Sequence, residues 1–435
     1  MSLGLIGVAG IAALLIVLFF FGMPVGFAMG LVGFFGFCYV VSFKAGLNMI
    51  SSELWTTFSN YGLTVIPLFI FMGQIAFYSG VNEKLYRCAY RWVGHIRGGI
   101  AMATVIACAA FSSICGSNAA TAATMSTVAL PQMKKFNYHP KLSTGAVACG
   151  STLGVVIPPS VVLIVIGLST EQSIARLFYG GIGAGVLLCL LLMLTIYVLC
   201  RVYPEWGPSG PESTFIEKLR SLSGAYEMLI LFLLVMLGLY LGVFTPSEAG
   251  AAGSLLAVLI SVIQGRLSWK GFILSVTDTL RVSSMIIMIV AGAVIFGRFL
   301  AVTRIPFDIA SWVVALPLPK IAVMGVIFCI YIIGGAIMDA LALLLITIPV
   351  FFPVAIELGY DPLWFAVTVT VVTTLGAVTP PVGATTYVVG AMAADVPLED
   401  VFRGVAYFIP AYVACILLLM MVPEIITFLP ALMMR

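Results

Sequence analysis

Ten apolar runs, each of a length that can cross a bilayer, limit the fold of this chain more than any other feature of its sequence. A transmembrane helix needs about 20 consecutive apolar residues. Backbone polar groups inside lipid must bond within their own segment, which favours helices. The sequence therefore predicts an all-α polytopic membrane protein. The runs lie at about 3–22, 25–43, 55–80, 143–169, 177–200, 226–244, 246–264, 281–300, 363–393 and 404–430.

The composition excludes several classes of protein. Of the 435 residues, 62% are hydrophobic and 9% are charged, whereas soluble proteins average about 45–50% and about 25%. A net charge of +3 is too small to attract polyanions such as nucleic acids. The sequence has two histidines, nine scattered cysteines without a CxxC pair, and no HExxH, GxSxG or GxxxxGK[ST] motif. We therefore predict that the chain is not an enzyme and carries no organic cofactor.

The two halves of the sequence share landmarks at a nearly constant offset. Pro158-Pro159 and Pro380-Pro381 lie 222 residues apart, and Gly116 and Gly334 lie 218 residues apart. Each half contains five of the apolar runs, and an odd number of crossings turns the second half upside down relative to the first. We predict two inverted repeats, 1–205 and 226–435, joined by a cytoplasmic linker at 206–225.

The basic residues indicate how the chain is oriented. Cytoplasmic loops of membrane proteins are enriched in Lys and Arg. Placing the segment 81–97 in the cytoplasm puts 14 of the 20 basic residues on that side and both termini in the periplasm. The six basic residues on the periplasmic side are Lys44, Arg176, Arg298, Arg304, Lys320 and Arg435.

Two further apolar regions, at about 98–132 and 320–354, are interrupted near their middle by small or polar residues. In this orientation each region is flanked by loops on a single face, so each must enter and leave there as a re-entrant hairpin. The paired prolines break the helices at 143–169 and 363–393. Non-helical backbone at membrane depth is tolerated only inside protein or beside a watery cavity. Opposed hairpins beside broken helices therefore indicate a transporter binding site.

The first candidate Na⁺ site combines the tip of the first hairpin with the first broken helix. Ser117 and Asn118 supply neutral side-chain oxygens, and the Gly154–Pro158 break exposes backbone carbonyls. Oxygens of this kind suit Na⁺. Small residues also let helices pack closely, and paired prolines also kink helices, so a purely structural role stays open.

The second candidate Na⁺ site combines the second hairpin tip with the second broken helix. Gly334, Met338 and Asp339 belong to that tip, and Thr379 precedes the second Pro-Pro pair. An ionisable residue at mid-membrane is expensive and usually functional. Asp339 could instead carry a proton or act only as a helix cap.

An anionic substrate is expected between the two tips, where a half-helix N-terminus favours negative charge. Arg298 and Arg304 near the periplasmic end of one crossing could meet that substrate or serve as interfacial anchors. The candidate substrate-binding residues are Ser117, Asn118, Thr121, Asp339, Thr379, Pro380, Gly383, Arg298 and Arg304.

Two other segments have structural interpretations. Asn82–Arg97 alternates aromatic and basic side chains, which predicts a helix that lies in the membrane interface and braces the first hairpin. Thr245-Pro246-Ser247-Glu248 predicts a helix start at which the Thr245 hydroxyl and the Glu248 carboxylate cap free amides.

Several motifs, taken in order, make the whole chain resemble the large membrane subunit of the tripartite ATP-independent periplasmic (TRAP) transporters. The basic stretch Arg298–Arg304 departs from the family pattern. The stretches that carry the resemblance are Ile66–Gly73, Gly116-Ser117-Asn118-Ala119-Ala120-Thr121, Gly154–Ser160, Phe244–Ala249 and Leu375–Gly383.

The resemblance implies a Na⁺-coupled secondary transporter of the bacterial inner membrane. It implies two protein partners, a small four-helix membrane subunit and a periplasmic substrate-binding protein. It also implies an organic acid with a carboxylate as substrate, such as a C4-dicarboxylate, a keto acid or sialic acid. By the same resemblance, the two hairpins and the two broken helices form a domain that moves like an elevator against a scaffold.

Three alternatives stay open on the sequence alone. The nearest is a stand-alone Na⁺ or H⁺ symporter for dicarboxylates that needs no binding protein. An intramembrane enzyme would need paired aspartates on adjacent helices or one of the catalytic motifs absent above. A passive channel would not need the inverted repeats, which favour alternating access.

Overall fold

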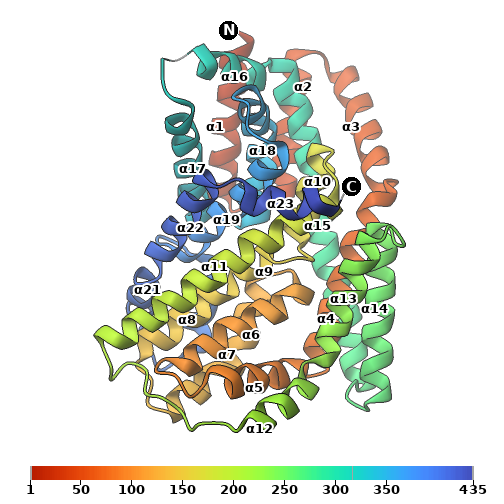
Figure 1. Ribbon diagram of the computed structural model, residues 1–435. Helices are drawn as coiled ribbons and strands as arrows, with labels where there is room; N and C mark the ends of the chain where they lie inside the picture. The colour runs from red at the N-terminus through yellow and green to blue at the C-terminus, as the bar shows by residue number, and fades with distance from the viewer. Residues whose placement is uncertain (1, 316, 434–435) are drawn as a thin grey trace.

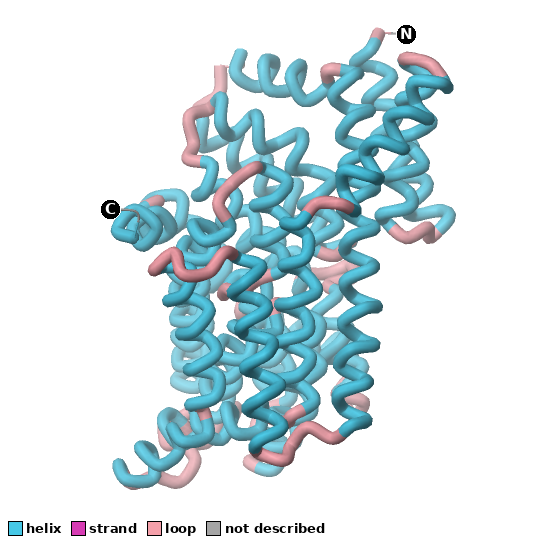
Figure 2. The backbone as a smooth tube through the Cα atoms, turned by 90° about the vertical axis from the view of Figure 1, so that its right-hand side faces the viewer, coloured by secondary structure: helices cyan, strands magenta, loops and turns pink. Residues whose placement is uncertain are grey.

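The computed structural model describes residues 2–315 and 317–433, and every regular element in these residues is a helix. Nine helices of this part are long and apolar enough to cross a membrane, and a bent helix pair at 215–240 gives a tenth. The expectation of an all-helical membrane protein is thereby confirmed. Most helices run along the long axis of the molecule, and short helices lie across it at both ends (Figure 2).

The first half of the chain forms the helices α1 to α11. They are α1 (Leu3–Phe21), α2 (Val25–Val40), α3 (Phe43–Phe58), the 3₁₀ helix η1 (Tyr61–Thr64), α4 (Val65–Tyr78), α5 (Val81–Val93), α6 (Gly99–Cys115), α7 (Asn118–Lys135), α8 (Pro140–Ser151), α9 (Leu153–Val156), α10 (Val161–Thr170) and α11 (Ile174–Val202).

The second half begins after the linker and forms α12 to α23. They are α12 (Phe215–Ser221), the 3₁₀ helix η2 (Leu222–Gly224), α13 (Tyr226–Tyr240), α14 (Pro246–Ile263), α15 (Trp269–Thr303), α16 (Ile305–Ala315), α17 (Lys320–Ile337), α18 (Ala340–Glu357), α19 (Pro362–Val378), α20 (Ala384–Met392), α21 (Leu398–Ala406), α22 (Ile409–Met421) and α23 (Glu424–Met433).

Local capping chemistry sets many of these boundaries. The Thr245 hydroxyl accepts from the Glu248 amide at 3.4 Å, and the Glu248 carboxylate accepts from the Thr245 amide at 2.8 Å. This reciprocal capping box starts α14 as the sequence predicted.

The predicted runs 25–43 and 55–80 differ from the structure. Ser42 caps a separate helix, α3, by accepting from the Ala45 amide at 3.2 Å. The Asn60 side chain then accepts from the Gly62 amide at 2.8 Å and turns the chain before α4 begins at Val65. Helix α3 was missed because its mixed polar and apolar sequence contains no long apolar run.

Two other runs also have different limits in the structure. Helix α15 covers 35 residues rather than about 281–300, because its N-terminal part carries polar residues that still form helix. The run 404–430 is interrupted at Val422 and Pro423, which separate α22 from α23.

Glycines allow α2 and α15 to pack with their backbones in contact. A Cβ atom on Gly26 would lie 2.6 Å from the Met288 carbonyl oxygen, and one on Gly33 would lie 2.7 Å from the Phe296 Cα. Small residues at helix interfaces permit this approach in membrane proteins. Helices from opposite halves of the chain therefore join into one unit.

The predicted interfacial helix is α5, which lies across the lower end of the molecule beneath α6 and α7 (Figure 1). Its buried face packs on α6. Its Lys84 ammonium lies 3.5 Å from the Glu227 carboxylate, which also binds the Arg266 guanidinium at 3.1 Å. Glu227 is almost fully buried, so this ion-pair cluster joins α5, called the arm helix below, to α13 and to the loop before α15.

Candidate functional site

The tip of the first helix pair is a two-residue turn between α6 and α7. Gly116 adopts φ +62°, and Ser117 caps α7 by accepting from the Ala120 amide at 3.4 Å. The buried Thr121 hydroxyl donates to the Ser117 carbonyl oxygen at 2.8 Å. The sequence folds this way because Gly tolerates positive φ and Ser is a preferred helix cap.

Asn118, the first residue of α7, holds an unsatisfied oxygen at this tip. Its Oδ1 atom is shielded from solvent and has no hydrogen-bond partner among the described residues. A buried carbonyl oxygen without a donor costs about 1–3 kcal/mol. A bound cation would satisfy this oxygen.

The break between α9 and α10 packs directly against the first tip. A Cβ atom on Gly154 would lie 2.8 Å from the Ser117 carbonyl oxygen, and one on Gly116 would lie 3.1 Å from the Pro159 carbonyl oxygen. Helix α9 ends at Val156, ahead of the Pro158-Pro159 pair. The structure therefore brings Ser117, Asn118 and the Gly154–Pro158 break together.

The second tip is the turn between α17 and α18. The Asp339 carboxylate caps α18 by accepting from the Leu341 amide at 3.0 Å, and Met338 precedes it as the first residue of the turn. Gly334 lies one turn earlier, where a Cβ atom would meet the Leu343 side chain.

The break between α19 and α20 packs against the second tip. The Ala336 carbonyl oxygen accepts from the amides of Val382 and Gly383 at 3.0 and 3.1 Å. The Thr379 hydroxyl donates to the Gly376 carbonyl oxygen at 3.0 Å, just before Pro380. Gly383 is thus bonded to the second tip through its backbone, and Thr379 and Pro380 precede it in the same helix break.

One cavity of about 160 Å³ brings the two tips together. Gly116 to Ala120 line one side, and Asp339 to Leu341 line another. The N-termini of α7 and α18 therefore face the same space, although they are more than 200 residues apart in the sequence. Their free amides and dipoles favour an anion there.

The formal charge of this cavity comes from a single carboxyl group. Asp339 is the only lining residue that carries a formal charge, and no Lys or Arg is among the lining residues. In the described residues, no group of three or more His, Cys, Asp or Glu is placed to hold a metal. A cation at the tips would therefore be held mainly by neutral oxygens, and an anionic ligand would need backbone amides or a bound cation as its partner.

Sequence reasoning missed the third wall of the cavity, which comes from α4 and α15. Gln74 is its polar residue, and the other members of this wall are Ile70, Gly73, Val282, Met285 and Ile286. The lone polar side chain within the apolar stretch from Ile66 to Ala76 was a usable signal for Gln74. The α15 residues carried no such signal, because they are apolar like their neighbours.

Arg298 and Arg304 do not line this cavity. The Arg298 Nε atom lies 2.7 Å from the Glu53 carboxylate of α3. Arg304 ends α15 with φ +60°, and its guanidinium lies 5.5 Å from the centre of the Phe307 ring. Both guanidinium groups are therefore engaged by neighbours in this structure, and the geometry gives neither one a place beside the tips.

Comparisons with known proteins agree with this architecture. Residues 12–425 match the family described as the tripartite ATP-independent periplasmic transporter, DctM component. The C4-dicarboxylate TRAP transporter large permease protein DctM of Pseudomonas aeruginosa is 34% identical over 388 residues, 88% of each chain. The sialic acid TRAP transporter large permease protein SiaM of Vibrio cholerae is 29% identical over 416 residues, 95% of this chain and 96% of the relative.

A solved structure shows the same fold. The YdaH transporter of Alcanivorax borkumensis, whose crystal structure reveals an unusual topology, matches with a TM-score of 0.61 and 15% identity over 88% of both chains. At this identity the likeness concerns the fold alone.

Proposed function

This chain belongs to the DctM family of large TRAP permeases, and we propose that it imports a carboxylate-bearing organic acid in symport with Na⁺ across the bacterial inner membrane. As a member of this family it is a multi-span transporter subunit and not an enzyme. The family works with a periplasmic binding protein and a small membrane subunit.

The unpaired Asn118 Oδ1 atom is the observation that carries this proposal. It lies at a tip where the helix is interrupted and where the Gly154–Pro158 break packs against Ser117. Neutral side-chain and backbone oxygens at broken helices suit Na⁺. We assign the first Na⁺ site to Ser117, Asn118, Gly154 and Pro158.

The second Na⁺ site is proposed at the second tip. Asp339 supplies a carboxylate there, and Gly334, Met338 and Thr379 supply backbone or hydroxyl oxygens from the adjoining turn and break. The Ala336 carbonyl oxygen already accepts from the Val382 and Gly383 amides. The proposed ligands are therefore the oxygens of Gly334, Met338, Asp339 and Thr379.

The substrate is proposed to bind between the tips after the ions. A carboxylate fits the free amides at the start of α7, beside Ser117, Asn118 and Thr121. Because Asp339 adds negative charge to the same cavity, a bound Na⁺ lowers the electrostatic cost of bringing in an anion. The second half of the site is assigned to Asp339, Thr379, Pro380 and Gly383. C4-dicarboxylate and sialic acid, named for two relatives, both carry a carboxylate.

Transport is proposed to follow an elevator motion. The hairpins α6–α7 and α17–α18 would move with the broken helices of the two inverted repeats, 1–205 and 226–435. Helices α4 and α15 would stay in the scaffold, since they supply the apolar wall of the cavity. Both chain termini are proposed to lie in the periplasm.

Reconstituted transport tests this function. The chain is purified with its small subunit, placed in liposomes and supplied with the loaded binding protein. We expect uptake to require an inward Na⁺ gradient and to stop when choline replaces Na⁺. Equal uptake without the gradient would contradict Na⁺ coupling. Uptake by the large subunit alone would instead favour the stand-alone symporter.

A matched pair of variants locates the first ion site. Asn118→Leu removes the unpaired oxygen while keeping the number and branching of the side-chain heavy atoms, and should raise the Na⁺ concentration needed for half-maximal uptake by about tenfold. Asn48→Leu makes the same change on the exposed face of α3 and should leave that concentration unchanged. An unchanged Na⁺ requirement in Asn118→Leu would remove this side chain from the site.

A further inference from the structure

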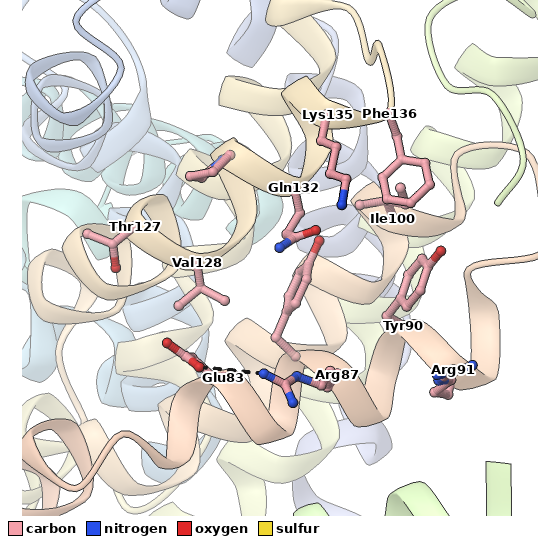
Figure 3. Close-up of a pocket in the computed structure, with 12 residues that line it drawn as sticks. Glu83, Arg87, Tyr90, Arg91, Ile100, Thr127, Val128, Gln132, Lys135 and Phe136 are labelled. Carbon is pink, nitrogen blue, oxygen red and sulfur yellow. Dashed lines mark ion pairs between the residues drawn. The ribbon is translucent and has the colours of Figure 1, made fainter. Parts of the chain in front are cut away.

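A second cavity, of about 390 Å³, lies between the arm helix α5 and the first hairpin (Figure 3). Arg87 and Arg91 reach it from α5, and Lys135 and Gln132 reach it from α7. It shares no lining residue with the cavity between the hairpin tips. The transport function proposed above assigns it no role.

The lining of this second cavity is basic. Three cationic side chains face one carboxylate, that of Glu83, which lies 3.8 Å from Arg87 on the same helix. The Arg87 side chain is 78% exposed, so this pair is weak and can rearrange around a ligand. Arg91 lies 3.6 Å from Glu217 in another exposed pair. Lys135 makes no ion pair within the part of the chain that the structure describes.

Two tyrosine hydroxyls in the lining lack partners. The Oη atoms of Tyr86 and Tyr90 are shielded from solvent and have no hydrogen-bond partner among the described residues. Tyr86 as a whole is only 5% exposed. A buried hydroxyl is normally bonded, so both groups are available to donate to an oxyanion inside the cavity.

The position of the cavity favours a lipid over a soluble ion. Helix α5 is strongly amphipathic and exposes Trp92 by 39%, as interfacial helices do. Apolar side chains of Val128 and Phe136 line the same cavity beside the basic groups. Basic pockets between membrane helices on the cytoplasmic side suit anionic lipid head groups.

We propose that this cavity binds the phosphate of an anionic phospholipid such as phosphatidylglycerol. Arg87, Arg91 and Lys135 neutralise the phosphate, and the tyrosine hydroxyls donate to its oxygens. The lipid then joins the arm to the first hairpin, so that one ligand touches both elements.

Lipid binding to the purified full-length chain tests the proposal. The chain in detergent is titrated with phosphatidylglycerol or with phosphatidylcholine of the same acyl chains, and bound lipid is counted by native mass spectrometry. The wild type should prefer phosphatidylglycerol. The double variant Arg87→Gln/Lys135→Gln should weaken that binding by about 25-fold, since each basic group contributes about fivefold.

Two further variants separate binding from folding. Lys270→Gln removes an exposed lysine outside the cavity and should bind like the wild type. Tyr86→Phe removes only an unpaired hydroxyl, so the fold should keep its stability while phosphatidylglycerol binding falls. Equal phosphatidylglycerol binding by the wild type and the double variant would overturn the proposal. Competition by glycerol 1-phosphate at the same concentration as the lipid would overturn the lipid assignment in favour of a soluble phosphate ester.

Discussion

Gly335 of α17 and Gly376 of α19 lie back to back, so close that a Cβ atom on Gly376 would come within 2.7 Å of the Gly335 Cα. The same Cβ atom would lie 2.6 Å from the Ile332 carbonyl oxygen. Both neighbours are backbone atoms, which cannot swing aside as a flexible side chain can. This contact fixes the second hairpin to the second broken helix.

Gly376→Ala should therefore force the two helices apart. Overpacking of this kind costs about 1–3 kcal/mol, and the displaced tip should also reduce transport. Gly325→Ala is the matched control on α17, because nothing lies within 4 Å of its Cβ position. It should leave the fold intact or stabilise it by about 0.5–1 kcal/mol. Thermal unfolding of both variants in detergent distinguishes them, and equal melting temperatures would contradict the backbone contact.

Asp339→Asn should separate the capping role of Asp339 from its role in ion binding. Asn caps helices about as well as Asp, so the bond from the Leu341 amide should survive and the melting temperature without Na⁺ should stay the same. Loss of the charge should weaken the rise of melting temperature with Na⁺, which reports the ion affinity. Asp339→Ala should lose both properties, with about 1 kcal/mol from the lost cap. A wild-type response to Na⁺ in Asp339→Asn would show that the carboxylate is only a cap.

Gln74→Met should weaken substrate binding without disturbing the fold. Gln74 is the polar residue on the α4 and α15 wall, opposite the hairpin tips. Loss of one hydrogen bond to a charged ligand corresponds to roughly a tenfold rise in KM for uptake. Gln264→Met changes the end of α14, where the side chain binds Tyr226, and should keep the wild-type KM. The same KM in both variants would exclude Gln74 from the substrate site.

His139 should make stability depend on pH. It stacks on Trp206 at 4.4 Å, and its Nδ1 accepts from the Lys141 amide. Burial, followed by the charge of Lys141, lowers the pKa of His139 below its ordinary value of 6.5, while Asp400 and Glu205 act in the opposite direction. Below pH 6.5 the unfolded chain then binds more protons than the folded one, so stability falls as the pH drops.

Thermal unfolding at pH 7.5 and pH 5.5 checks this dependence on His139. His139→Asn keeps an acceptor for the cap but cannot titrate, so the difference between the two melting temperatures should shrink. A full pH response in His139→Asn would assign the effect to another group.

Much of the hairpin geometry could be predicted from short motifs. The sequence Gly116-Ser117-Asn118 needs positive φ, then a cap, then a helix start, and each step follows from one residue type. The paired prolines likewise require a helix break wherever the chain places them. The pair Arg298–Glu53 could not be predicted in this way, because its members are 245 residues apart and α3 was not expected as a separate helix.

The sequence by itself determined that this chain is helical, lies in a membrane and breaks its helices beside Pro158 and Pro380, because hydropathy, capping and proline chemistry act locally. Only the tertiary structure decided that α7 and α18 point their N-termini into one cavity and that Gln74 faces them. Helices that are apolar on every side carry little signal of which face meets which neighbour. That choice depends on close backbone contacts such as Gly335 with Gly376, which exist only once the chain has folded.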